Sequence, residues 1–201
     1  MTGIDYINSG ILEQYVLGST SPFETKEVEE MAAAYTIVRQ EIESIKIALE
    51  KYAQSNAVAP NPVIKPFLLA TIDYTERIKN GEPVTNPPML HEKSTIIDFD
   101  EWLNRTDMVP KSSTDLFAKI IGYSAKATTA IVWIKDYAPQ EVHDHEYEKF
   151  LIVEGTCNII VGEEVHALIA GDYFSIPLHK SHLVQVTSTI PCKVILQRVA
   201  A

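Results

Sequence analysis

Histidines and carboxylates gather in one short stretch of the C-terminal half, Glu141-Val-His143-Asp-His145-Glu-Tyr-Glu148. Residues two apart on a β-strand point to the same side, so His143 and His145 can converge on one ion. Neutral imidazoles together with a carboxylate suit zinc, iron, manganese, nickel or copper. The stretch therefore predicts a site for one divalent metal ion, which the surrounding elements must assemble.

The elements around this stretch have the two-residue period of β-strands. Short β-branched runs such as Thr128 to Lys135 and Lys193 to Val199 are separated by turn residues such as Gly155 and Gly162. Several short strands at this spacing indicate a β-sandwich or a β-barrel.

Two segments resemble the paired motifs of the cupin family. In the first, six residues separate Glu148 from Gly155, and in the second, five residues separate Gly171 from Pro177, which a histidine follows. The resemblance runs from about Ser112 to Ala201. It implies a jelly-roll barrel of the RmlC-like cupin type that holds one divalent ion, of zinc, iron, manganese or nickel. The metal ligands that it implies are His143, His145, Glu148 and His182.

The ligand set has open alternatives. Only two residues separate His145 from Glu148, so a straight strand would place them on opposite faces, and a turn or bulge is required. A second register puts Glu141 and His143 in the His-x-His positions of the motif. His179 stands where the second motif has a glycine, and either adds a ligand or lies on the barrel rim.

The first 80 residues have the period of helices instead. Ser21 as N-cap, Pro22 at the first helical position and Glu24 at the third form a strong start signal. Apolar spacing predicts four amphipathic helices, at about residues 6–17, 22–35, 37–55 and 63–79.

The chain is therefore expected to be an α+β protein of two domains. A helical domain resembling a four-helix bundle takes residues 1–80, a proline-rich linker takes residues 81–93, and the cupin domain takes residues 94–201.

The stretch from Tyr6 to Ile72 resembles the N-terminal domain of bacterial anti-sigma factors. The matching features are Ile11-Leu-Glu-Gln-Tyr-Val-Leu-Gly18, the Ser21-Pro22 helix start, and Arg39-Gln-Glu-Ile-Glu. Zinc-dependent members carry a His-x3-Cys-x2-Cys element, and the corresponding positions here are Met31, Tyr35 and Val38. The resemblance is thus to the zinc-free members. The order of helical domain, linker and cupin resembles the ChrR-type anti-sigma proteins.

This resemblance implies a transcriptional regulator. Its helical domain would bind an extracytoplasmic-function sigma factor, and its cupin domain would sense through a bound metal ion or small ligand. A metal-dependent cupin enzyme, such as a dioxygenase or an isomerase, is the less favoured alternative, and no catalytic residue is assigned. A third alternative is a small-molecule-binding cupin that forms a homodimer through its barrel.

Charge and composition limit which kinds of partner and which location are expected. The net charge is −10, and both halves carry more acidic than basic residues, so direct binding to nucleic acid is not expected. No apolar run approaches the roughly 18 residues that span a bilayer, and no signal peptide is visible, so a cytoplasmic protein is expected. The two cysteines, Cys157 and Cys192, are expected to be reduced and buried.

Overall fold

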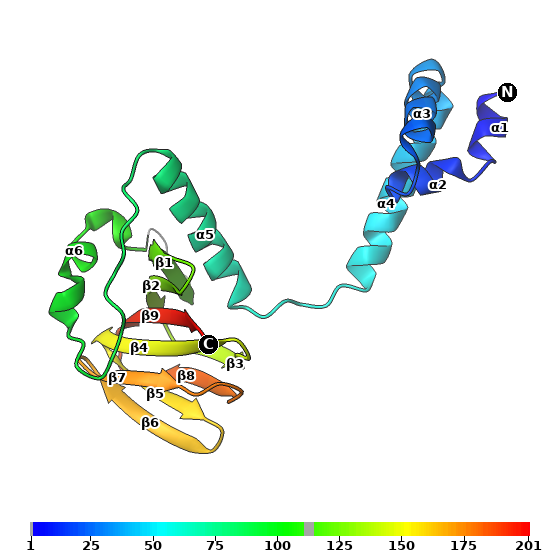
Figure 1. Cartoon of the computed structure of the whole chain (residues 1–201). Helices are drawn as coiled ribbons and strands as arrows, with labels where there is room; N and C mark the ends of the chain where they lie inside the picture. The colour runs from blue at the N-terminus through cyan, green and yellow to red at the C-terminus, as the bar shows by residue number, and fades with distance from the viewer. Residues whose placement is uncertain (1, 111–114) are drawn as a thin grey trace. The chain divides into compact units, whose positions relative to one another are not determined.

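The structure is a computed structural model, and it describes residues 2–110 and 115–201. It forms two compact units, an N-terminal unit (Met1–Ala59) and a C-terminal unit (Pro60–Ala201) (Figure 1). Within the described residues, none of the helices combines the length and hydropathy that crossing a bilayer requires.

The N-terminal unit consists of helices. Their bounds are α1 (Gly3–Ile7), α2 (Ile11–Val16), α3 (Pro22–Ala34) and α4 (Thr36–Ser55). The single helix expected over residues 6–17 is two short helices, because Gly10 adopts a left-handed backbone with φ of 77° and precedes α2 as its N-cap. Helix α3 begins as expected, with a reciprocal capping box between Ser21 and Glu24.

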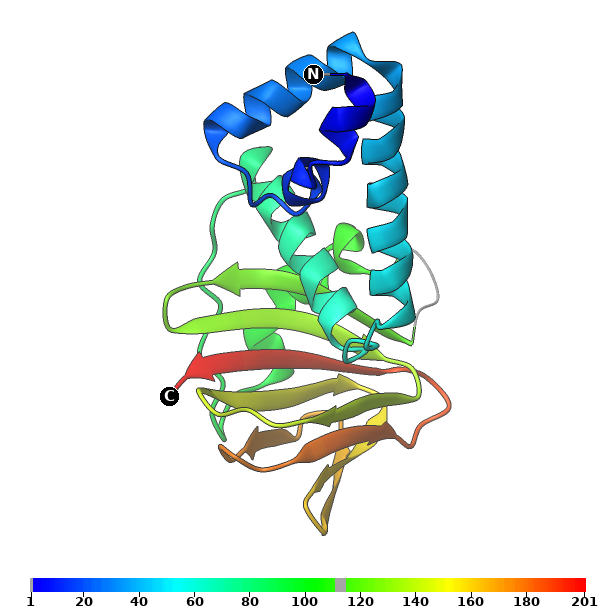
Figure 2. The same cartoon turned by 90° about the vertical axis from the view of Figure 1, so that its right-hand side faces the viewer.

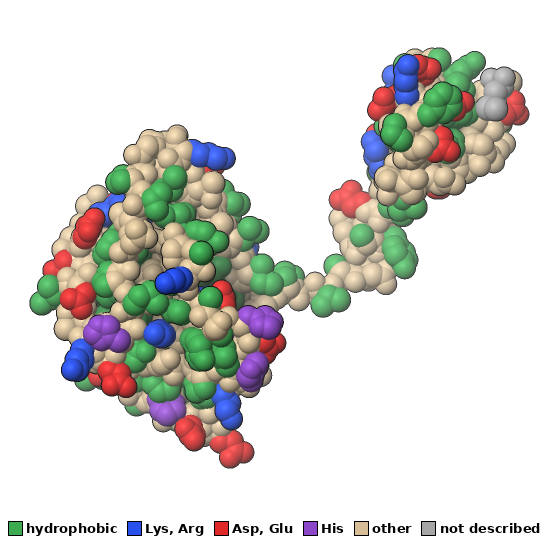
Figure 3. All heavy atoms as spheres, viewed as in Figure 1, with side chains coloured by type: hydrophobic (Ala, Val, Ile, Leu, Met, Phe, Trp, Pro, Cys, Tyr) green, Lys and Arg blue, Asp and Glu red, His purple; other side chains and the backbone are tan. Residues whose placement is uncertain are grey.

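Helix α4 is the packing partner of the other three helices in this unit. The core is small. Its buried members are Tyr6, Leu12, Val28, Val38 and Ile42. Many other apolar side chains of the unit lie on its surface (Figure 3).

The C-terminal unit is a jelly-roll β-sandwich preceded by helices, and the sandwich confirms the expected fold of this region. Its first sheet has the strand order β1-β2-β9-β4-β7, and its second has the order β3-β8-β5-β6 (Figures 1 and 2). All the strand pairs are antiparallel. The strands are β1 (Leu116–Tyr123), β2 (Ala127–Ile134), β3 (Tyr137–Glu141), β4 (Glu146–Glu154), β5 (Thr156–Val161), β6 (Glu164–Ile169), β7 (Tyr173–Ile176), β8 (His182–Val186) and β9 (Cys192–Ala200).

The sandwich interior is filled by the inward side chains of both sheets. Ile152 on β4, Ile159 on β5 and Val194 on β9 are completely buried there. Cys157 and Cys192 belong to the same cluster and are free thiols. The close-packed interior thus holds the strands, and the side chains at their ends, in fixed positions.

Helix α5 (Ile64–Lys79) belongs to this unit, so the division after Ala59 differs from the domain boundary expected at residue 80, and the expected four-helix bundle is not confirmed. The helix lies against β1 (Figures 1 and 2). Its Ala70 joins the sandwich core, and Asp73 is ion-paired with Lys119 of β1. Its helical period was correctly predicted, but the period does not reveal which surface the apolar face covers.

Residues 85–108, here called the strap, cross the outer face of the first sheet. They include the short helices η1 (Ile96–Phe99), α6 (Asp100–Leu103) and η2 (Thr106–Met108). The strap buries Leu90, Phe99, Trp102 and Met108 against strand residues of that sheet.

The sequence predicts a linker over residues 81–93, but residues 85–93 belong to the strap, which contacts the first sheet. The backbone N–H of Leu90 donates to Gln197 Oε1 at 2.8 Å, and Gln197 Nε2 donates to the carbonyl of Pro88. A side chain on Gly122 would collide with Pro87, with a Cβ only 2.2 Å from the proline Cδ, so the glycine permits the crossing. The expected start of the cupin region at Ser112 lies outside the described residues.

Candidate metal site

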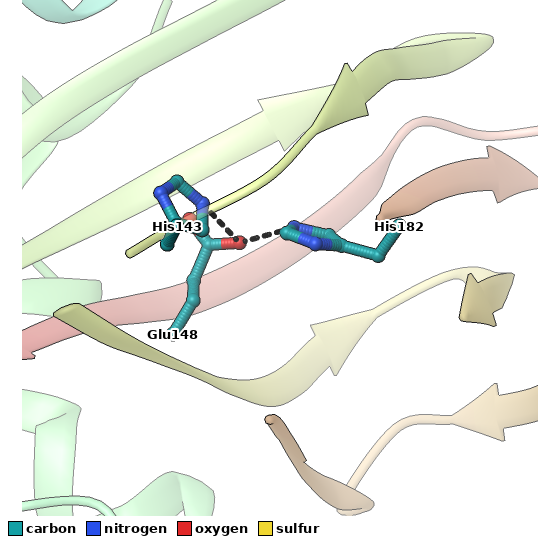
Figure 4. A group of neighbouring side chains, drawn as sticks. All are labelled: His143, Glu148 and His182. Carbon is teal, nitrogen blue, oxygen red and sulfur yellow. Dashed lines mark hydrogen bonds and ion pairs between the residues drawn. The ribbon is translucent and has the colours of Figure 1, made fainter. Parts of the chain in front are cut away.

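Three side chains from different elements meet at one end of the sandwich. Glu148 lies on β4, His182 opens β8, and His143 lies between β3 and β4. Figure 4 shows the three pointing toward one another, and their ligand atoms all lie within 4.8 Å of one another. Of the four expected ligands, the structure therefore brings these three together.

Each member of this group is fixed by its surroundings. Glu148 and His182 are buried, with exposed fractions of only 3% and 4%. The Nδ1 of His182 is 3.2 Å from the carbonyl of Lys180, and donation to that oxygen turns Nε2 toward the carboxylate. The backbone N–H of His179 donates to the carbonyl of His143, which holds the irregular segment beside the site.

The distances within the group leave one imidazole unsatisfied. His182 Nε2 lies 2.9 Å from Glu148 Oε2, a hydrogen bond. His143 Nε2 lies 3.6 Å from the same oxygen, is buried, and has no hydrogen-bond partner among the described residues. Because buried polar atoms are nearly always paired, this nitrogen is in place for a ligand that the protein itself does not provide. Two imidazole nitrogens and one carboxylate oxygen fit a divalent metal ion.

Arg198 of β9 completes the polar surroundings. Its Nε donates to Glu148 Oε1, and its Nη2 donates to Glu141 Oε2, both at 2.9 Å. The first contact follows from strand register, because Arg198 is the cross-strand partner of Glu148. Arg198 thus occupies one carboxylate oxygen of Glu148 and leaves the other facing the imidazoles.

The electrostatics favour an ionised Glu148. Burial would raise its pKa, but the facing imidazoles of His143 and His182 and the charge of Arg198 outweigh burial, and the pKa is well below the ordinary value. Burial would likewise lower the pKa of His182, but its hydrogen bond to Glu148 raises that pKa above the ordinary value. Burial raises the pKa of Glu141, which Arg198 only partly offsets.

The remaining sequence candidates lie differently. His145 is exposed in the turn before β4 and lies outside the group of three, with its carbonyl accepting from the backbone of Ala201. His179 is also exposed, and its ring Nδ1 contacts Asp144 at 3.0 Å. Glu141 is closer, with Oε2 at 3.4 Å from His143 Nε2. Its cross-strand partner is His182, so the register that joins Glu141 with His143 has a structural basis.

Sequence reasoning missed Arg198. Its position on the last strand, 50 residues from Glu148, carries no motif. The available signal was an arginine at the inward-facing position that follows Val194 and Leu196 on an inner strand, because such a charge needs a partner.

A cavity of about 390 Å³ opens beside the site. Its polar lining consists of Asn61, Gln140, Glu141, His143 and Arg198, and its apolar lining consists of Val63, Ile64, Phe67 and Val142. The Arg198 guanidinium lies 4.6 Å from the centre of the Phe67 ring, so helix α5 contributes directly to the surroundings of the candidate ligands.

Comparison with known proteins concerns the fold of this region. Residues 131–197 match the family model described as the cupin domain, so the C-terminal region contains a cupin domain. No curated protein matches the chain.

Solved structures with a similar fold include three cupins. The cupin domain of Cnp3 from Schizosaccharomyces pombe is 12% identical, with a TM-score of 0.42, and the match covers 44% of this chain and 67% of that one. An RmlC-like cupin from Shewanella frigidimarina is 23% identical, with a TM-score of 0.38 and coverage of 44% and 79%. A cupin superfamily protein from Desulfitobacterium hafniense is 13% identical, with a TM-score of 0.43 and coverage of 60% and 100%.

Proposed function

We propose that the cupin domain binds one divalent metal ion through His143 Nε2, Glu148 Oε2 and His182 Nε2. The observation that carries this proposal is the buried, unpaired Nε2 of His143 beside a buried Glu148–His182 pair. Zinc, iron, manganese and nickel all accept this set of atoms.

The residues around the ligands support a site that also accepts a further molecule. Three protein ligands leave coordination positions open, and when bound the metal would supply a Lewis acid there. Arg198 orients Glu148, and the Lys180 carbonyl orients His182. Such a site suits sensing of a small ligand. An oxygenase or isomerase reaction is the alternative use of the same metal, and no specific observation favours it.

A matched pair of histidine variants tests the metal site. His182→Ala removes a buried ligand and should weaken zinc binding by at least about 100-fold, since loss of groups that merely orient ligands already costs about 10- to 100-fold. His145→Ala removes an exposed imidazole and should leave binding unchanged. Calorimetric titration with zinc and metal analysis of the purified full chain measure both. Equal affinity in the two variants would contradict the proposal.

We further propose that the protein is a regulator whose N-terminal unit binds an extracytoplasmic-function sigma factor. The supporting observation is the apolar surface of that unit, where Leu17, Phe23 and Tyr52 are 65%, 78% and 69% exposed. An amphipathic helical unit with such side chains suits burial of an apolar face against another protein. Pairing of two chains through their cupin domains is the alternative assembly.

Co-purification tests the partner with the full chain. The wild-type protein should retain an extracytoplasmic-function sigma factor from the same cells, and Phe23→Ser should lose it. Val165→Ser alters a 59% exposed apolar residue of β6 and serves as the control. Recovery of no sigma factor by the wild-type chain, or equal recovery by Phe23→Ser, would refute this role. Light scattering of the purified chain tests the homodimer.

A further inference from the structure

The cavity beside the metal site has a size suited to a small molecule. Its volume of about 390 Å³ lies within the range of roughly 300–1,000 Å³ that is usual for ligand pockets. His143, one of the candidate metal ligands, and Arg198 both line it. A molecule in the cavity would therefore meet both the metal site and a guanidinium group.

Arg198 has donor capacity left over. Its Nε and Nη2 donate to Glu148 and Glu141, respectively. Its Nη1 has no hydrogen-bond partner among the described residues, and the Arg198 side chain, which lines the cavity, is 22% exposed. Two N–H donors on an accessible guanidinium nitrogen are a ready contact for an anionic oxygen.

The charge of the metal-bound site also favours an anion. Metal-bound imidazoles are neutral, so a divalent ion with Glu141, Glu148 and Arg198 leaves one positive charge uncompensated. One negative charge would neutralise the site. Without the metal, Glu141, Glu148 and Arg198 carry one excess negative charge, and a protonated His182 would only cancel it, so no uncompensated positive charge remains to attract an anion.

The apolar part of the cavity lining determines which chemical group can be attached to the anion. Val63, Ile64 and Phe67 come from the start of α5, and Val142 comes from the segment after β3. These side chains provide an apolar surface but no charge. A hydrocarbon group attached to the anionic group would bury its surface against them.

From these features we infer that the cavity binds a small monocarboxylate with an apolar body, held by Arg198 Nη1 and dependent on the metal. This inference rests on the proposed metal site and names the class of ligand that the site accepts. Because the two binding events are linked, the carboxylate should tighten metal binding by the same factor as the metal tightens carboxylate binding.

The test uses the zinc-loaded full chain, with benzoate as the probe and benzamide as its neutral isostere. Calorimetric titration should show at least tenfold tighter binding of benzoate, and no binding of benzoate to the metal-free chain. Equal affinity for the two probes, or benzoate binding that persists without metal, would overturn the inference.

A pair of valine variants locates the binding. Val142→Asp places a carboxylate in the cavity wall and should weaken benzoate binding at least tenfold while zinc still binds. Val165→Asp changes an exposed valine on β6 and should have no effect on either ligand. Unchanged benzoate binding in Val142→Asp would place the ligand elsewhere. A chain that takes up no metal would instead refute the proposed function, and direct zinc titration distinguishes that result.

Discussion

The two units of this chain differ in how completely they cover their apolar residues. Among the described residues, the N-terminal unit has one buried cluster of five, whereas the C-terminal unit has clusters of sixteen and eight. In the first 59 residues, large apolar side chains such as Phe23 and Tyr52 are mostly exposed. In the C-terminal unit, even the proline-rich strap is held against the first sheet by buried side chains and hydrogen bonds.

This contrast bears on the roles proposed for the two units. A unit with a small core depends on additional contacts for stability, because stability scales with the apolar surface removed from water. A unit that buries both faces of a sheet can hold polar groups at fixed distances, as it does around Glu148. The contrast fits the proposals that the first unit binds a partner protein and that the second binds a metal ion and a small ligand.

The largest expected effect would come from the small core. Leu12 is completely buried, so Leu12→Ala should cost about 3–5 kcal/mol and unfold the N-terminal unit alone. Helical circular dichroism should fall, while the fluorescence of Trp102 and Trp133, both in the C-terminal unit, stays native. Leu17→Ala, at a 65% exposed position, should change stability by less than about 0.5 kcal/mol. A changed tryptophan signal in Leu12→Ala would show that the two units fold together, and would contradict the expectation that the N-terminal unit unfolds alone.

Metal binding should stabilise the C-terminal unit only. Zinc at a free concentration 100 times its dissociation constant should stabilise the C-terminal unit by about 2.7 kcal/mol, because only the folded unit presents the ligands together. The unfolding transition followed by tryptophan fluorescence should move to higher denaturant. No movement with zinc, or the same movement in His182→Ala, would contradict binding at this site.

The strap provides a smaller effect. Gln197 is completely buried and satisfies the strap backbone at Leu90 and Pro88. Gln197→Ala should destabilise the C-terminal unit by about 1–3 kcal/mol, because the N–H of Leu90 loses its partner. Gln185→Ala, at an exposed position of β8, is the control. Equal denaturation midpoints for the two variants would show that the strap contributes little.

The smallest effect concerns pH. The pKa of His182 is raised above 6.5, so the protonated ring stabilises the fold. This contribution is complete below pH 6.5 and is lost as the pH rises through the raised pKa. Metal-free protein should therefore lose some stability above pH 6.5, and His182→Gln should lose less over the same range. Urea titrations at several pH values measure both, and identical pH dependence would exclude His182 as the cause.

The sequence predicted the parts of the site whose spacing is fixed by strand geometry. His143, Glu148 and His182 meet as the cupin motifs implied. His145 does not, because β4 begins only at Glu146 and the preceding residues turn, so the two-residue alternation does not apply there. The short spacing between His145 and Glu148 indicated that the strand had to be irregular there. It did not indicate on which side the His145 side chain would lie.

The arrangement of apolar faces was less accessible to sequence reasoning. The period of residues 63–79 correctly indicated a helix, yet the strand that it lies against carries Lys119, the ion-pair partner of Asp73 46 residues away, which the local pattern does not reveal. Residues 81–93 have the composition of a linker, but one glutamine more than a hundred positions later anchors them. Such anchoring depends on distant partners that local composition does not report.

The contact between Leu90 and Gln197 also constrains the order of events during synthesis. The two residues are 107 positions apart, and Gln197 lies on β9, which the ribosome makes after all the other strands. At about 5–20 residues per second, the segment around Leu90 waits roughly 5–20 s for its anchor. During that time Leu90 and Trp102 lack their final cover, so nascent chains are most exposed to chaperones and to self-association just before β9 appears.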